Sequence, residues 1–364
     1  MRRGLSQAEL AGILDVTERT IRKYETLGAP LVASGMLGEA LDFPEDYFSR
    51  PTTVDMELAK VSFRAGRSTT RRQRESAKAA GHAAVEVRQW IAARFRLPGV
   101  DVPDLSGESP EVAADLLRSL WGLGTKPLPN LVQLCESRGV SVSGLPPVAA
   151  SVDAYSAWDV GRPHIFVAQQ KTPERARFDM AHELGHLILH KYRGDAPQPG
   201  EEDEANAFAS EFLIPRDSLH EYLRMNPTFD ELLKVKTAFA VSLFALVYAA
   251  HKKGRMSDWA YRMTCAELSE RGFRNGEPGG MRSFEHSRIY SFVLSSEKGG
   301  RVTGERIGRE LALPVEDVRA AMLNTELHSV KSKESGGLPT GDLAMDSLLR
   351  GRPADAPRNG LRLV

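Results

Sequence analysis

The run His182-Glu183-Leu184-Gly185-His186 holds three side chains whose types and spacing suit metal-assisted hydrolysis. Histidines four positions apart lie on one face of a helix, so His182 and His186 can reach the same metal ion. Glu183 follows the first histidine and can take a proton from a water molecule at that metal. Zinc lowers the pKa of such a water to roughly 7, which yields hydroxide for attack on an amide carbonyl. The motif therefore predicts a zinc-dependent peptidase.

A catalytic zinc site needs a third protein ligand and one open position. Candidate carboxylates lie in the acidic run 201–204, at the start of the next expected helix. Glu204 shares a helix face with Phe208 and Phe212 at steps of four, which points it toward the core. We therefore predict Glu204 as the acidic ligand, with Glu201 as the alternative. The other two acids are expected to point elsewhere, in a solvated first turn that favours negative charge.

His190 lies one turn beyond His186, too far along the helix axis to be a third ligand, and is expected to support the site or the helix end. The sequence leaves open which side chain would donate to a transition-state oxyanion. The candidates are His164, His220, His251, Tyr155 and Tyr192.

The motif is embedded in an apolar run, FDMAHELGHLILH, which predicts a long buried helix over 172–190. Ionisable groups inside such a helix need partners, which favours a metal over two ordinary core histidines. Short β-like runs precede it and further helices surround it. We expect strands at 140–142, 151–155 and 164–167, and helices at 111–120, 131–137, 202–213 and within 284–323.

The composition places few restrictions on partners. The chain of 364 residues has 48 Lys and Arg against 48 Asp and Glu, so whole-protein attraction to nucleic acid or membrane is not expected. Its two cysteines exclude a disulfide framework and favour a reducing cytoplasm. The N-terminus lacks the apolar region of a signal peptide. The apolar stretch 237–250 is short for a membrane span and predicts a buried core helix.

The first 28 residues predict two short helices joined by a turn. Ser6 and Glu9 have the spacing of a capping box at the start of the first helix. Asp15 and Val16 form the expected turn, and Thr17 caps a second helix that ends before Gly28 and Pro30.

The run ERARFDMAHELGHLILH, followed by DEANAFASEFLIP, resembles the ImmA/IrrE family of metallopeptidases. Upstream, DAYSAWDVGRPHIFVAQQKTPER is similar to the family's strand-bearing segment. Downstream, AVSLFALVYAAHKKGRMSD and ELSERGFRNGEPGG resemble the helical extension of members fused to a helix-turn-helix. The resemblance implies an α+β, mostly helical zincin-like domain with a small sheet and one zinc ion per chain. It implies His182, His186 and Glu204 as ligands and Glu183 as general base, acting on a partner transcriptional repressor.

The run GLSQAELAGILDVTERTIRKYE resembles the lambda-repressor-like (XRE) helix-turn-helix. Such a module lays its second helix in the major groove, so Glu18, Arg19 and Lys23 are the expected base contacts, and Arg22 and Gln7 the phosphate contacts. A protein-docking element that never touches DNA is the alternative. The family's module has a helix before this run, and here the sequence begins three residues ahead of it. Another part of the chain, or a second protomer in a homodimer, would then complete the core.

These patterns divide the chain into five parts. They are a helix-turn-helix (1–50), a helical connector and linker (51–109), a peptidase domain (110–254), a C-terminal helical extension (255–330) and a disordered tail (331–364). The resulting hypothesis is a cytoplasmic zinc endopeptidase that cuts a repressor or antitoxin-like protein and is positioned by its own DNA-binding module. The alternative is a non-cleaving transcriptional regulator, or a toxin–antitoxin component, whose peptidase-like domain senses a metal or a ligand.

Overall fold

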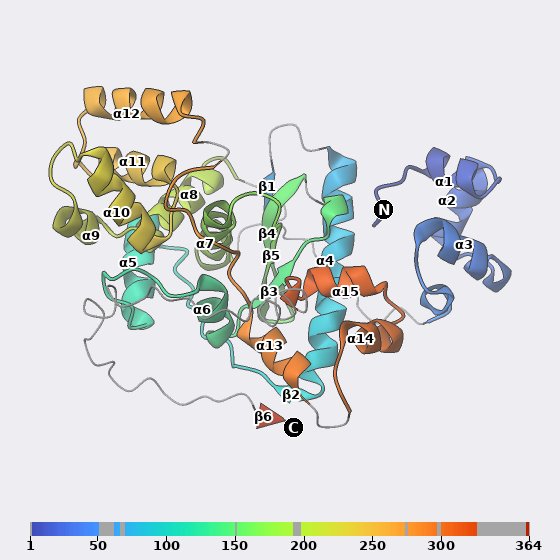
Figure 1. The fold of residues 1–364 in the computed structure, drawn as a ribbon. Helices are drawn as coiled ribbons and strands as arrows, with labels where there is room; N and C mark the ends of the chain where they lie inside the picture. Colours follow the sequence, from blue (N-terminus) through green and yellow to red (C-terminus); the bar gives the residue numbers. More distant parts are fainter. Residues whose placement is uncertain are drawn as a thin grey trace, which may run out of the picture.

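The computed structural model describes residues 2–50, 62–65, 70–149, 151–191, 198–273, 276–296, 300–325 and 362–363. Its elements are mostly helices around one small sheet (Figure 1). The N-terminal part contains α1 (Gln7–Ile13), α2 (Glu18–Leu27), η1 (Leu31–Ala33), α3 (Ser34–Leu41) and η2 (Glu45–Phe48). The predicted disordered tail lies outside the described residues, apart from β6 (Arg362–Leu363), which pairs with β2 (Phe95–Arg96).

The main sheet has four strands in the order β1-β4-β5-β3. Strands β4 (Val152–Asp159) and β5 (Arg162–Val167) form an antiparallel hairpin, whose turn places Val160 and Gly161 at positive φ. On one side β3 (Ser141–Gly144) runs parallel to β5. On the other side β1 (Ser62–Ala65) runs antiparallel to β4. The three strands predicted at 140–167 are confirmed within a few residues.

Two helices cover the two faces of this sheet: α7 (Pro173–Leu189) and α4 (Arg71–Ala92) (Figure 1). Because successive side chains of a strand point to opposite faces, Ser156 faces α7 while Tyr155 faces α4. Their hydrogen bonds show this division, since Ser156 donates to Glu183 of α7 and Tyr155 donates to the Ala77 carbonyl of α4. A Cβ at Gly81 would lie 1.9 Å from the Tyr155 hydroxyl, so glycine allows α4 to approach the sheet.

The remaining helices, in chain order, are α5 (Pro110–Leu120), α6 (Leu131–Ser137), η3 (Pro147–Ala149), α8 (Glu201–Leu213), α9 (Arg216–Tyr222), α10 (Phe229–Phe239), α11 (Leu243–Lys252), α12 (Asp258–Glu270), α13 (Arg288–Ser295), α14 (Gly304–Leu311) and α15 (Val315–Ala321). The segment expected to be helical within 284–323 is thus three separate helices, α13 to α15.

The hydrophobic core crosses the predicted domain boundaries. Buried side chains of α4, placed by the sequence in a connector, share one cluster with the sheet and α7. Helices α13, α14 and α15, placed in the C-terminal extension, contribute to the same cluster and contact α6, α4 and β3. Residues 97–109, just before the boundary predicted at 109/110, form no helix or strand.

Among the described residues, no single helix combines the length and apolar composition of a membrane span. Helices α10 and α11 reach that length and composition only as a pair, which is bent by 105° at the break between them. The core helix predicted at 237–250 is therefore two helices, with Ala240 in the left-handed conformation at the end of α10.

The N-terminal part forms the two predicted helices and their turn. Ser6 and Glu9 make the expected capping box, and Thr17 caps α2. Ion pairs connect this part to the rest of the chain, from Arg2 and Arg3 to Asp317 and from Glu9 to Arg72. A cavity of about 280 Å³ remains between its helices. Its lining includes Leu10, Ile21, Tyr24, Leu37, Phe43 and Tyr47.

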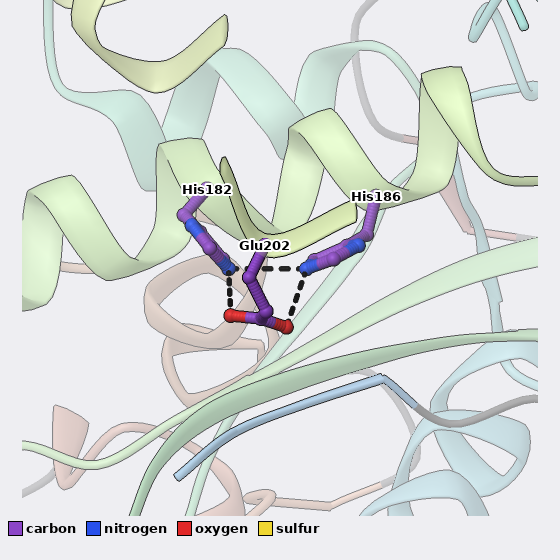
Figure 2. A group of neighbouring side chains, drawn as sticks. All are labelled: His182, His186 and Glu202. Atoms are coloured by element: carbon purple, nitrogen blue, oxygen red, sulfur yellow. Dashed lines mark hydrogen bonds and ion pairs between the residues drawn. The ribbon is translucent and has the colours of Figure 1, made fainter. Parts of the chain in front are cut away.

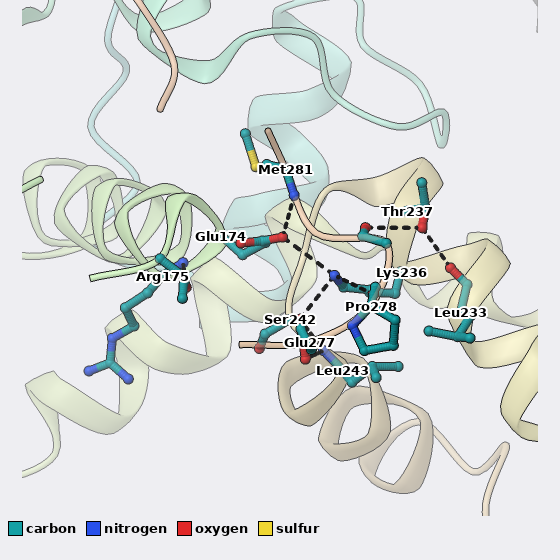
Figure 3. Close-up of polar contacts among 12 residues, drawn as sticks. Glu174, Arg175, Leu233, Lys236, Thr237, Ser242, Leu243, Glu277, Pro278 and Met281 are labelled. Carbon is teal, nitrogen blue, oxygen red and sulfur yellow. Dashed lines mark hydrogen bonds and ion pairs between the residues drawn. The ribbon is translucent and has the colours of Figure 1, made fainter. Parts of the chain in front are cut away.

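A buried cluster of charges joins the start of α7 to α10 and to the segment before α13 (Figure 3). The Lys236 ammonium lies 3.4 Å from Glu174 and 3.1 Å from Glu277, and its side chain is 1% exposed. Glu174 also accepts a hydrogen bond from the Met281 amide, and Glu277 accepts one from the Leu243 amide. The N-terminal end of α7 is therefore held by contacts with residues about 60 to 110 positions later.

Replacing Lys236 by Met should destabilise the protein by about 3–5 kcal/mol, because it leaves two buried carboxylates without their cation. The methionine retains most of the side-chain volume, so the loss of stability measures the removal of the charge and not the creation of a cavity. Chemical denaturation followed by circular dichroism measures it. Lys234→Met is the matched control, since Lys234 is exposed on the same helix and should change stability by less than about 0.5 kcal/mol. Equal effects of the two substitutions would contradict the role given to Lys236.

Candidate metal centre

Helix α7 carries the predicted motif and is buried along most of its length. Thr172 caps its N-terminus and Pro173 occupies the first turn, as favoured at helix starts. His182 and Glu183 are 0% exposed, and His186 is 4% exposed. A Cβ at Gly185 would lie 2.9 Å from the Phe208 ring, so glycine at this position lets α8 pack closely against the motif.

His182, His186 and Glu202 converge, each offering one ligand atom within 4.8 Å of the others (Figure 2). The two Nε2 atoms are 3.0 Å apart. One oxygen of the Glu202 carboxylate lies 3.4 Å from Nε2 of His182, and the other lies 3.4 Å from Nε2 of His186. The histidines come from α7 and the glutamate from the first turn of α8, so the packing of these two helices creates the group.

Each imidazole is oriented through its other nitrogen. Nδ1 of His182 lies 3.1 Å from Oδ1 of Asn206, which has to accept, so this nitrogen carries the proton. Nδ1 of His186 lies 2.8 Å from Nδ1 of His190, whose Nε2 lies 2.8 Å from the Glu204 carboxylate. Because the carboxylate accepts from Nε2 of His190, Nδ1 of His190 is the acceptor for His186. Both Nε2 lone pairs are thereby directed toward Glu202 and away from the orienting partners.

The structure places Glu202, and not the predicted ligand Glu204, next to the two histidines, and Glu204 contacts His190 instead. Glu202 and Glu204 flank the buried stripe of α8, which contains Ala205 and Phe208, on opposite sides. Helix periodicity places Glu202 and Glu204 alike at an edge of the buried stripe. Only the packing of α8 on α7 decides which of the two lies next to the histidines. The alternative, Glu201, is buried on the stripe and is not part of the group.

Glu183 is placed on the sheet side of α7. Its Oε2 accepts a 2.7 Å hydrogen bond from the hydroxyl of Ser156, which is itself 4% exposed. This bond fixes the Glu183 carboxylate against β4, on the helix that carries both histidines. Sequence reasoning missed Ser156, because a serine in a strand carries no signal of its own until the strand is paired with a helix.

The candidate oxyanion donors that the structure describes make their contacts elsewhere. Tyr155 and His164 belong to the α4 face of the sheet, where both stack on Phe166. Burial, reinforced by Arg88 and Arg162, lowers the pKa of His164 to about 3, so it is neutral. His220 and His251 bond instead to the Lys253 carbonyl and to Asp258. Tyr192 lies outside the described residues.

The predicted DNA contacts lie on α2 and at the start of α1. Glu18, Arg19, Arg22 and Lys23 are exposed on α2. Gln7, at the start of α1, donates a 2.5 Å hydrogen bond to Glu25. The structure therefore leaves the α2 residues accessible and gives Gln7 an internal partner.

The residues present fit a zinc ion. Two imidazole nitrogens and a carboxylate are a donor set that zinc binds, and Zn–N bonds of about 2.0–2.1 Å put tetrahedral ligand atoms about 3.4 Å apart. The distances of 3.0, 3.4 and 3.4 Å are close to that spacing. The Glu202 side chain is 52% exposed, so solvent keeps its carboxylate charged at neutral pH while both Nε2 atoms offer lone pairs. The carboxylate is thus ionised, as a metal ligand must be.

Comparison with known protein families gives a match over the middle of the chain. Residues 135–251 match a family model described as the IrrE N-terminal-like domain, within the peptidase families. The matched range includes β3 to β5, α7 and α8, and therefore every residue of the group. Comparison with individually curated proteins gives no match for the chain. The family match supports a metallopeptidase-like function for this part of the chain, and with it a metal cofactor.

Proposed function

We propose that this protein is a zinc-dependent endopeptidase that hydrolyses a peptide bond in a partner protein. The observation that carries the proposal is the convergence of two buried Nε2 atoms and one ionised carboxylate from two helices, beside a buried glutamate. Zinc held by His182, His186 and Glu202 would act as a Lewis acid and lower the pKa of a water molecule. Cysteine or serine nucleophiles are not needed for this reaction class.

The residues around the metal have distinct roles in this proposal. Glu183 takes the proton of the attacking water and returns it to the leaving amine, as a general base and then a general acid. Ser156 holds the carboxylate of Glu183 toward the reacting atoms through its 2.7 Å hydrogen bond. Asn206 and His190 keep the imidazoles oriented, and Glu204 stabilises His190.

The substrate proposed here is a transcriptional repressor or antitoxin-like DNA-binding protein. The resemblance of the zinc-motif region supports this class, and so does the N-terminal helical pair with its exposed α2. Incubating the zinc-loaded chain with the repressor encoded beside its gene should give two fragments, and a chelator should prevent the cleavage. Stoichiometric zinc with an intact repressor would argue against the proposal.

A regulatory function without cleavage is the second candidate, and the exposure of Arg19, Arg22 and Lys23 on α2 favours it. If α2 enters a major groove, Arg19→Ala should relax sequence preference and cost about 1–3 kcal/mol of binding free energy. Arg22→Ala should weaken binding to all sequences alike and reduce the salt dependence. Fluorescence anisotropy with operator and random duplexes distinguishes the two effects. Binding that is unchanged in both variants would assign α2 to protein docking.

A further inference from the structure

The outer edge of β4 is covered by a short strand from a distant part of the chain. Strand β1, residues 62–65, pairs antiparallel with β4, and the register places Ser62 opposite Ser156, Phe63 opposite Tyr155 and Arg64 opposite Ala154. The register shifts between Arg64 and Ala65, so the regular pairing is only three residues long. An edge strand offers unpaired backbone groups to any extended peptide, and such pairing is a common mode of peptide recognition.

This edge lies beside the candidate metal centre. Ser156, the β4 residue opposite Ser62, donates its hydroxyl to Glu183. Strand β1 also contacts α7, the helix that carries both histidines. Figure 2 shows the light-blue β1 passing below the group, on the side toward which the Glu202 carboxylate points. Glu202 is the exposed member of the group, with 52% of its side chain accessible, so a substrate would reach the metal from this side.

We propose that residues 62–65 act as an internal competitor, because they occupy the outer edge of β4, where an extended peptide substrate would pair. The proposal rests on the peptidase function above. Backbone pairing with β4 would place a peptide alongside Ser156 and Glu183. The substrate class is therefore an extended protein segment, recognised mainly through its main chain.

The pairing of residues 62–65 with β4 is short enough for a substrate peptide to replace it. A three-residue pairing next to a register shift makes few ladder bonds, in contrast to the six paired positions between β4 and β5. Tethering nevertheless gives the segment an effective concentration in the millimolar range. A substrate must then displace β1, which keeps the activity of the full chain low until a strongly pairing segment arrives.

A reversible disulfide across β1 and β4 tests this proposal. In the full-length chain with Glu183→Gln, which prevents consumption of the probe, Arg64→Cys and Ala154→Cys place two thiols at register partners. The probe is a fluorescent synthetic peptide with the sequence of residues 58–69, followed by anisotropy. The reduced protein should bind it, the oxidised protein should bind at least about tenfold more weakly, and reductant should restore binding. Each single-cysteine variant is the control and should not respond to oxidation.

A full-length Phe63→Pro variant gives the opposite change, because proline removes a backbone donor and weakens a strand. It should bind the same peptide more tightly than the parent chain by about tenfold or more. Failure of the disulfide to form, or equal peptide binding by the oxidised and reduced forms, would overturn the proposal. Binding requires no catalysis, so a protein that passes these tests and cleaves nothing refutes the peptidase function and leaves the peptide site in place.

Discussion

Glu183→Gln is expected to lower the rate of peptide hydrolysis by about 10²–10⁴-fold while one zinc ion per chain is retained. Glu183 contributes no ligand atom to the His182, His186 and Glu202 group, so its loss should leave the metal in place. The amide keeps the shape of the carboxylate and can still accept the hydrogen bond from Ser156. It cannot take a proton from water, and that is the property being tested.

Single-turnover cleavage and metal analysis on the same preparation measure the two effects separately. Asp203→Asn is the matched control, because Asp203 is an exposed acid in the first turn of α8 and should retain both zinc and activity. Loss of zinc in Glu183→Gln would show that the glutamate supports the metal and not the chemistry. Full activity with zinc present would remove Glu183 from the mechanism.

The features predicted correctly from the sequence are those that depend on neighbouring residues. The i, i+4 spacing of His182 and His186 sets their common face, whatever the helix packs against. The helix at 131–137 has the predicted bounds, and the Ser6–Glu9 capping box forms as expected, because side-chain to backbone bonds three residues apart decide both helix starts.

The features that escaped prediction depend on contacts between distant segments. Ser156 bonds to Glu183 only because β4 packs against α7. Residues 62–65 form a strand only because they pair with the edge of β4. Helix α4 lies in the segment that the sequence predicts as a helical connector. Its small residues, Ala77, Ala80 and Ala84, form the buried face that packs on the sheet. Alanine spacing is a weak hydrophobic signal, so it does not by itself predict that this face packs on the sheet.

Glu202→Gln is expected to weaken zinc binding by more than about 100-fold, because it removes a charged ligand next to two imidazoles. Glu204→Gln is the matched variant on the other flank of the same helix turn. Its amide oxygen can still accept from His190, so zinc affinity should fall by no more than about tenfold. His190→Ala breaks the link from Glu204 to His186 and should cost about 10–100-fold, the usual effect of losing a partner that orients a ligand. Competition with a chromogenic zinc chelator gives all three dissociation constants.

The order of the three variants decides which acid holds the metal. If Glu202 is the ligand, its substitution has the largest effect, that of His190 is intermediate and that of Glu204 is the smallest. If Glu204→Gln weakened zinc binding most and Glu202→Gln had little effect, the ligand would be Glu204, the acid predicted from the sequence. Helix α8 would then have to rotate about its own axis against α7 when zinc binds. Because Asn206 lies on the Glu202 flank and bonds to His182, such a rotation would break that hydrogen bond. In the rotated arrangement, Asn206→Ala would consequently leave the affinity for zinc unchanged. In the arrangement described above, the same substitution should lower the affinity for zinc about 10–100-fold.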